Sequence, residues 1–223
     1  MQRLDGPRLA PAGGGPARQL VVLLHGVGAD GTDLAGLAPI WAQDLPEAAF
    51  VAPDAPFPCD MAPYGRQWFS LGFSLADRDP QRMAAGVRAV APAVEAFLAE
   101  ELARLGLRPD ALALMGFSQG AMTALHVGLR GAVPPAAILA YSGALLAPDT
   151  LGAELRARPP VLIVHGEADE VVPAWAGRFA ESALHEAGVP TEAVFIPGLG
   201  HGIDDAGLAA GARLLGRVFQ PAQ

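Results

Sequence analysis

Lysine is absent from this chain, and all 15 basic residues are arginines. Without lysine there is no phosphate-binding loop of the Walker type, no lysine for a Schiff base and no serine–lysine dyad. The arginines are dispersed along the sequence, and the formal net charge is −8. Proteins that bind nucleic acids carry clustered basic residues, so we expect no nucleic-acid partner.

Cysteine and long apolar runs are also scarce. Cys59 is the single cysteine, which excludes an intrachain disulfide and is typical of a reducing compartment. No apolar run is long enough to span a bilayer, so we expect no stable membrane insertion. Residues 1–18 lack the continuous apolar core of a signal peptide, which predicts a cytoplasmic location. No Cys/His spacing suits a structural zinc site, and we expect no metal.

Apolar runs that are typical of strands alternate with segments of helical periodicity. The expected strands are residues 19–25, 48–52, 111–115, 136–141, 161–164 and 193–196, and the expected helices are residues 81–105, 121–129, 174–187 and 204–219. Pro92 is expected to kink the first of these helices or to restart it. Continuous apolar strands alternating with helices predict an α/β fold, with a mostly parallel central sheet and helices on both faces.

The length of 223 residues fits one domain. We expect a single α/β domain over residues 19–223. A Pro/Gly-rich N-terminal segment, residues 1–18, precedes it, with an extra edge strand as one option. In sheets of this kind, functional sites lie in the loops beyond the carboxyl ends of the strands. Four such loops carry the candidate residues.

The most informative stretch is residues 116–120, Gly-Phe-Ser-Gln-Gly, which form a G-x-S-x-G pentapeptide. An expected strand precedes it and an expected helix follows it. A sharp turn between the two forces the serine hydroxyl out of the backbone envelope. Glycines are needed on both sides because side chains there would collide across the turn. Ser118 is therefore the candidate nucleophile. The alternative is that it is an incidental serine in a glycine-rich turn.

A serine nucleophile needs a base, and the base needs a third group that fixes its tautomer. In α/β-hydrolases the chain order is serine, then acid, then histidine, which leaves His165, His185 and His201. His185 lies within an expected helix, and His165 precedes the acidic candidates. His201 lies in a glycine-rich loop after the last strand. We predict that His201 is the general base, with a surface loop histidine as the alternative.

Three acidic residues follow the strand at 161–164, namely Glu167, Asp169 and Glu170. Asp169 is favoured because it lies between the end of the strand and the next helix. Glu167 and Glu170 are interpreted as charges at the rim or in the first helical turn. Asp204 and Asp205 come after the histidine and are expected to cap the last helix.

Ester cleavage also requires hydrogen-bond donors for the oxyanion. The backbone N–H of Gln119 is one candidate, because it lies at a helix N-terminus. The Val27 amide is the second, since Gly26 and Gly28 let this backbone approach a substrate closely. His25 precedes Ser118 in the chain, so we expect it to pack beneath this loop.

Four motifs in this order resemble the phospholipase/carboxylesterase family of α/β-hydrolases, which includes acyl-protein thioesterases and small bacterial carboxylesterases. The motifs are residues 24–30 (Leu-His-Gly-Val-Gly-Ala-Asp), 116–120, 165–173 (His-Gly-Glu-Ala-Asp-Glu-Val-Val-Pro) and 200–202 (Gly-His-Gly). The resemblance implies a compact fold without a large cap domain, and no cofactor. It also implies a triad and an oxyanion hole at the candidate residues Ser118, Asp169, His201, Val27 and Gln119.

The resemblance extends to residues 55–56 and 67–69, which are similar to the family's segments beside the acyl pocket. Candidate substrate-binding residues are Trp68, Phe69, Phe73 and Val172, with ordinary core packing as the alternative for the aromatic residues. One departure from the family is Ala121, where many relatives carry a further glycine. We expect the serine turn to keep its shape there.

The leading hypothesis is a serine carboxylesterase that cleaves a small-molecule ester through an acyl-enzyme. An acyl-protein thioesterase or a lysophospholipase with the same triad is the alternative. A more remote alternative is a non-catalytic ligand-binding protein with this fold. A related lactone hydrolase usually carries cysteine in place of Ser118. A homodimer is one option for relatives of this size, and no sequence feature decides it.

Overall fold

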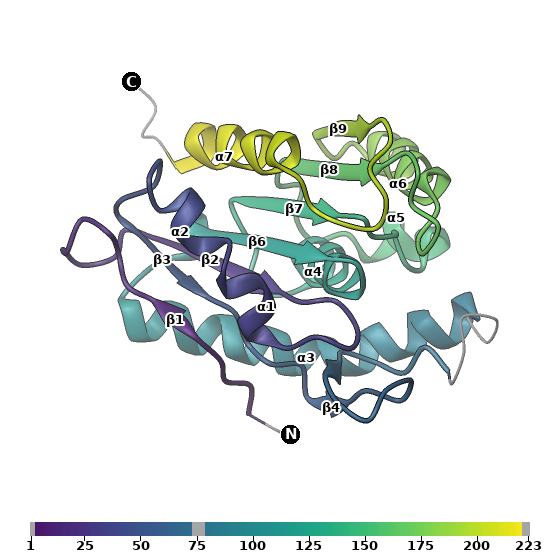
Figure 1. The fold of residues 1–223 in the computed structure, drawn as a ribbon, viewed down its shortest axis with the longest axis horizontal. Helices are drawn as coiled ribbons and strands as arrows, with labels where there is room; N and C mark the ends of the chain where they lie inside the picture. The colour runs from purple at the N-terminus through teal and green to yellow at the C-terminus, as the bar shows by residue number, and fades with distance from the viewer. Residues whose placement is uncertain (1–2, 73–78, 220–223) are drawn as a thin grey trace.

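A seven-stranded sheet crosses the middle of the protein (Figure 1), for which a computed structural model describes residues 3–72 and 79–219. Its spatial order is β1-β3-β2-β6-β7-β8-β9. These strands are β1 Arg8–Leu9, β2 Gln19–Leu24, β3 Ala48–Val51, β6 Leu112–Phe117, β7 Ala137–Tyr141, β8 Val161–Gly166 and β9 Thr191–Ile196. All neighbouring pairs are parallel except β1 with β3. The predicted α/β fold is confirmed.

Helices cover both faces of this sheet (Figure 1). One face carries α1 Gly31–Ala35, α2 Ala38–Trp41 and α7 Asp205–Phe219. The other face carries α3 Pro80–Leu105, α4 Gln119–Arg130, α5 Leu151–Glu154 and α6 Ala174–Glu186. Two 3-10 helices, Pro109–Ala111 and Pro148–Thr150, and a small hairpin of β4 Phe57–Pro58 and β5 Arg66–Gln67 complete the described elements.

Side chains of β2 show why the strands are continuously apolar. Leu20, Val22 and Leu24 point to the face covered by α3 and α4. Val21 and Leu23 point to the face covered by α1, α2 and α7. All five are fully buried, because successive strand residues alternate between two covered faces.

Helix α3 carries clear start and stop signals. The Asp79 side chain accepts a hydrogen bond from the Gln81 N–H at 2.9 Å, and Pro80 is the first helical residue. Gly106 ends the helix with a φ of 67°. Pro92 lies inside the helix, so the predicted restart there is wrong. The buried face of α3 packs on the core both before and after Pro92, which offsets the hydrogen bond that proline removes.

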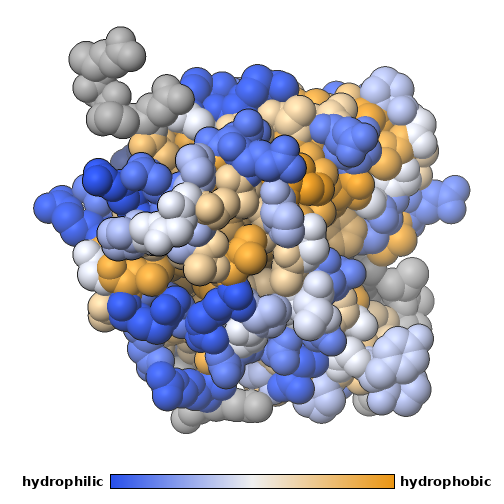
Figure 2. Space-filling model, turned by 60° about the vertical axis from the view of Figure 1, so that its left-hand side comes forward, coloured by the Kyte–Doolittle hydropathy of each residue, from blue (hydrophilic) through white to orange (hydrophobic). Residues whose placement is uncertain are grey.

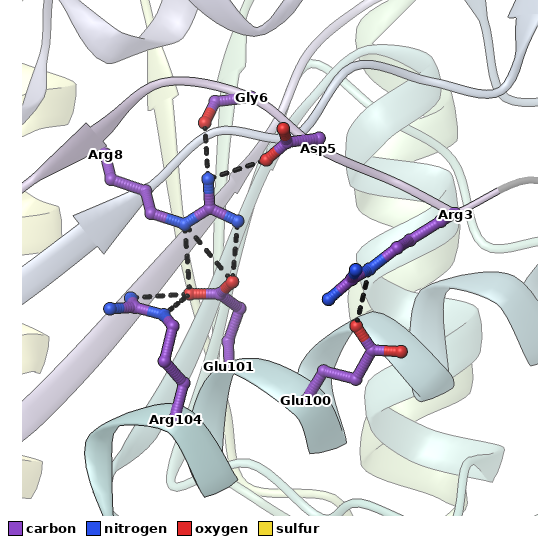
Figure 3. Close-up of polar contacts among 7 residues, drawn as sticks. All are labelled: Arg3, Asp5, Gly6, Arg8, Glu100, Glu101 and Arg104. Atoms are coloured by element: carbon purple, nitrogen blue, oxygen red, sulfur yellow. Dashed lines mark hydrogen bonds and ion pairs between the residues drawn. The ribbon is translucent and has the colours of Figure 1, made fainter.

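The N-terminal segment is tied to α3 by charged side chains (Figure 3). Arg8 and Arg104 both bind the Glu101 carboxylate, each with a shortest contact of 2.7 Å. Only 5% of the Glu101 side chain is exposed. Burial alone would raise the pKa of Glu101, but the two guanidinium groups hold it below its usual value. Arg3 binds Glu100 nearby at 3.1 Å, in a pair that is largely exposed.

We expect Glu101→Gln to lower the free energy of unfolding by about 1–3 kcal/mol, because it removes the charge that two arginines share at a buried site. Glu100→Gln is the matched control. It breaks an exposed ion pair and should cost less than about 1 kcal/mol. Urea unfolding of both variants at neutral pH measures the difference. Equal losses would show that the Glu101 cluster contributes no more than an ordinary surface pair.

A second charged cluster lies where α4 meets α3 and α5. His126 and Arg130 on α4 are 6% and 8% exposed. Glu154 accepts hydrogen bonds from Arg130 at 3.0 Å and from Arg88 at 2.7 Å. Burial, followed by the charges of Arg130 and Arg88, lowers the pKa of His126 to about 4. His126 is therefore neutral in the folded protein at neutral pH.

This lowered pKa predicts an acid-dependent loss of stability. The unfolded chain binds a proton at His126 near pH 6.5, whereas the folded chain resists it until pH 4. Stability should thus fall by about 2–3 kcal/mol as pH decreases through this window, on top of any loss from other groups. His126→Gln should remove that part of the loss. Urea unfolding at pH 7 and pH 4.5 compares the two proteins, and identical pH dependences would contradict the prediction.

Hydrophilic residues surround smaller hydrophobic areas on the face of the molecule drawn in Figure 2. Within residues 3–72 and 79–219, none of the helices combines the length and the apolar character that a membrane crossing requires.

Candidate active site

Ser118 lies in the sharp turn between β6 and α4. Its φ of 54° and ψ of −117° are strained for a residue with a side chain. A Cβ on Gly116 would come within 2.3 Å of the Gly120 backbone. A Cβ on Gly120 would come within 1.9 Å of the Leu24 carbonyl oxygen. The predicted reason for the flanking glycines is confirmed.

The Ala121 methyl group, next to the serine turn, has a specific neighbour. A Cβ on Gly143 would lie 2.5 Å from the Ala121 Cβ. Gly143 therefore leaves the space that the Ala121 methyl group occupies, so the serine turn is preserved.

Ser118, His201 and Asp169 come together at the carboxyl edge of the sheet, after β6, β9 and β8. His201 Nε2 lies 3.1 Å from Ser118 Oγ, and His201 Nδ1 lies 2.7 Å from Asp169 Oδ2. A carboxylate only accepts hydrogen bonds, so Nδ1 carries the proton and Nε2 is free to accept one from the serine. The His201 ring packs against Phe117 with centroids 4.8 Å apart.

The Asp169 carboxylate is buried and fully engaged. Its Oδ1 accepts the N–H groups of Val171 at 2.9 Å and Val172 at 2.8 Å, which leaves Oδ2 for His201. Burial alone would raise the pKa of Asp169. The hydrogen bonds from His201, Val172 and Val171 outweigh this and hold it below its usual value. Asp169 is therefore a carboxylate at neutral pH.

Backbone hydrogen bonds fix the loop after β8, which carries Asp169, against the loop after β9, which carries His201. Glu167 N–H donates to the Ile196 carbonyl at 2.9 Å, and Ala168 N–H donates to the Leu199 carbonyl at 2.9 Å. A Cβ on Gly166 would come within 2.2 Å of the Leu199 carbonyl oxygen, so only glycine fits there. This close approach holds Asp169 and His201 at hydrogen-bonding distance.

The other histidines have different partners. His165 is 1% exposed, and its Nε2 lies 2.7 Å from the Val172 carbonyl oxygen and 3.5 Å from Asp169 Oδ2. His165 thus helps to hold the loop that carries Asp169 and Val172 in place. His185 is exposed, with Nε2 3.0 Å from the Thr191 carbonyl oxygen. His25 is fully buried beneath the loop after β2, as predicted.

The remaining acidic candidates take no part in the hydrogen bonds that link Ser118, His201 and Asp169. Glu167 is exposed and pairs with Arg178 at 2.7 Å. Glu170 is exposed as well. Asp204 Oδ1 accepts the Gly207 N–H at 2.8 Å, which makes it the cap of α7, and Asp205 is the first residue of that helix. The interpretations of Glu167, Glu170 and Asp204 are confirmed, whereas Asp205 lies in the first turn of the helix and is not its cap.

The two predicted oxyanion donors flank Ser118. Gln119 is the first residue of α4, so its N–H has no acceptor within the helix. Val27 lies in the loop after β2, and the next residue, Gly28, has a φ of 83° that favours glycine. Gly26 lies close to Ser118, since a Cβ there would be 3.4 Å from Ser118 Cβ.

The predicted substrate-binding residues are mostly buried. Trp68, Phe69 and Val172 are 0%, 2% and 5% exposed, so all three pack within the core. Phe73 lies outside the described residues. Their contact with a substrate stays a prediction. Among the residues that the structure describes, no three His, Cys, Asp or Glu side chains are grouped so that they could hold a metal ion.

Comparison with known proteins places this geometry in a family. The phospholipase/carboxylesterase family matches residues 10–215. The chain belongs to that family. The matched range includes Ser118, Asp169 and His201 as well as the loops that carry Val27 and Gln119.

Characterised relatives agree with this assignment. Esterase YpfH of Escherichia coli K12 is 29% identical over 191 residues, which cover 85% of this chain and 78% of that protein. Carboxylesterase SOBER1 of Arabidopsis thaliana is 31% identical over 212 residues, covering 85% and 86%. The crystal structure of esterase PE8 has a TM-score of 0.92 at 41% identity, with coverage of 97% of this chain and 100% of that chain.

Proposed function

We propose that Ser118, His201 and Asp169 form the catalytic triad of this family member, which is a carboxylic ester hydrolase. The observation that carries the proposal is the continuous chain of hydrogen bonds from Ser118 Oγ through His201 to the buried Asp169 carboxylate. The chain order of the three residues and the strained serine turn are those of serine hydrolases with the α/β-hydrolase fold.

In the acylation step, Ser118 Oγ attacks the ester carbonyl carbon while His201 Nε2 takes the hydroxyl proton. Negative charge develops on the carbonyl oxygen, where the Val27 and Gln119 N–H groups stabilise it. The carbon–oxygen bond to the alcohol then breaks, and His201 returns the proton to the leaving alcohol. The product of this step is an acyl ester on Ser118.

In the deacylation step, water replaces the alcohol. His201 Nε2 takes a proton from the water, and the resulting oxygen attacks the acyl carbon. The bond to Ser118 Oγ breaks, His201 returns the proton to the serine, and the carboxylic acid leaves. Asp169 stabilises the charged imidazole in both steps and keeps the Nδ1 proton in place.

A series of p-nitrophenyl esters from acetate to palmitate tests this proposal. We expect turnover, with a burst of p-nitrophenol equal to one per protein molecule if deacylation is the slower step. A thioester with the preferred acyl chain compares the carboxylesterase and thioesterase alternatives, which use the same atoms. No turnover of any ester by folded protein would contradict the proposal.

We further propose a small-molecule ester as substrate and the cytoplasm as location. The location is supported by Cys59, a free thiol in a chain with no other cysteine.

A further inference from the structure

The two proposed oxyanion donors, Val27 and Gln119, come from loops that are far apart in the sequence. Their N–H groups must converge on one oxygen atom, and displacement of a catalytic group by about 1 Å can cost about 100-fold in rate. The β4–β5 hairpin leads into a segment, residues 66–69, that contacts both loops. We propose that this segment and the Gln119 side chain form a brace that fixes the two oxyanion donors relative to each other. This inference rests on the proposed function.

One end of the brace is bonded to the loop that carries Val27. The Gly28 N–H donates to the Arg66 carbonyl at 2.8 Å, and the Arg66 N–H donates to the Ala29 carbonyl at 2.8 Å. A Cβ on Gly65 would lie 2.0 Å from the Gly28 carbonyl oxygen, so the hairpin approaches this loop as closely as backbone atoms allow. The first bond is made by the residue directly after Val27.

The other end of the brace is bonded to the residue that follows the nucleophile. The Gln119 side chain uses both halves of its amide: Oε1 accepts the Trp68 N–H at 2.8 Å, and Nε2 donates to the Phe69 carbonyl at 2.6 Å. Gln119 is fully buried. The residue whose backbone N–H faces the oxyanion is thus held by its own side chain.

A third connection joins the middle of the brace to the base of the Val27 loop. The Trp68 indole N–H donates to the His25 carbonyl at 2.8 Å. The His25 ring accepts the Ala55 N–H at Nε2, 3.0 Å away, and its Nδ1 lies 2.7 Å from the Gly26 carbonyl oxygen. Burial lowers the pKa of His25, so the ring is neutral, with its proton on Nδ1. The indole therefore binds a loop whose position is already fixed.

These bonds give the buried Trp68 and the Phe69 backbone a positioning role. The brace joins residue 28 to residue 119 through four backbone positions, and its end at Gln119 is buried. Loss of the Gln119 amide would leave the Trp68 N–H and the Phe69 carbonyl unpaired in the core. The segment would then shift to find new partners, and the oxyanion donors would shift with it.

The test compares two tryptophan variants that make the same chemical change. Trp68→Phe removes the indole bond to His25. Trp41→Phe is the control, because Trp41 is also buried and its indole donates to the Leu208 carbonyl at 3.0 Å, on the face covered by α7. Gln119→Met is a third variant, which keeps the length of the side chain and removes both amide bonds. The readouts are kcat, KM, thermal midpoint and inhibition by a trifluoromethyl ketone, whose adduct with Ser118 places an oxyanion between the donors.

We expect Trp68→Phe and Gln119→Met to lower kcat by about 10- to 100-fold with little change in KM, and to weaken the ketone by a similar factor. Trp41→Phe should lower the thermal midpoint like Trp68→Phe but leave kcat and ketone affinity within about 3-fold of wild type. If kcat of folded Trp68→Phe and Gln119→Met matches that of Trp41→Phe, the brace is a structural element only and the inference is overturned. If wild type cleaves no ester, the proposed function fails first and the brace fails with it.

Discussion

Ser118→Ala should lower kcat by about 10⁵- to 10⁶-fold, the loss typical when a serine nucleophile is removed from an intact triad. Without Oγ, His201 has no hydroxyl to deprotonate and no acyl-enzyme forms. The variant removes a single oxygen atom, whose hydrogen bond to His201 lies within the site, so we expect the fold to stay intact. Initial rates on the preferred p-nitrophenyl ester measure the effect.

Ser142→Ala is the matched control for this variant. Ser142 is also buried, also has a positive φ of 47°, and lies at the end of the neighbouring strand β7. Its activity should stay within about 3-fold of wild type, because its hydroxyl has no role in the proposed chemistry. A loss of less than about 10-fold in Ser118→Ala would place the nucleophile elsewhere.

Asp169→Asn should lower kcat by about 10⁴-fold, because it reverses the tautomer of the base. The side-chain oxygen of the asparagine would be retained by the Val171 and Val172 N–H groups, which now bind Oδ1. Its NH₂ group would then face His201 Nδ1. That nitrogen would have to accept a hydrogen bond, so the proton would move to Nε2, where the serine proton must go.

Glu167→Gln is the control for Asp169→Asn, since it removes a charge two residues away that is exposed and paired with Arg178. We expect its kcat to remain within about 2-fold of wild type. The kcat ratio of the two variants separates the tautomer effect from a general change in charge. If both variants lose activity equally, Asp169 acts only through the local electrostatic potential.

The hydrogen-bonded set of Ser118, His201 and Asp169 could be predicted because each member has a local signal and a fixed order along the chain. Ser118 has flanking glycines between a strand and a helix, and His201 and Asp169 follow strands that end at the same edge of the sheet. The long strands were predicted for a similar reason, since β2, β6 and β8 are continuous apolar runs buried on both faces.

Features that depend on distant contacts could not be predicted in this way. The two-residue strands β4 and β5 are too short for any periodicity. Trp68 and the Gln119 side chain are 51 residues apart, and only the folded chain brings them together. Local propensity at Pro92 predicts a kink or a restart of the helix, whereas packing on the core keeps α3 continuous.

The site of acyl attachment identifies the nucleophile directly. Protein mixed with p-nitrophenyl acetate is quenched in acid before deacylation, digested, and its peptides are analysed by mass spectrometry. We predict one acetyl group per molecule on Ser118, and none in His201→Ala at the same time point. An acetyl group on Cys59, the free thiol near Gly28, would contradict the central claim that Ser118 is the nucleophile.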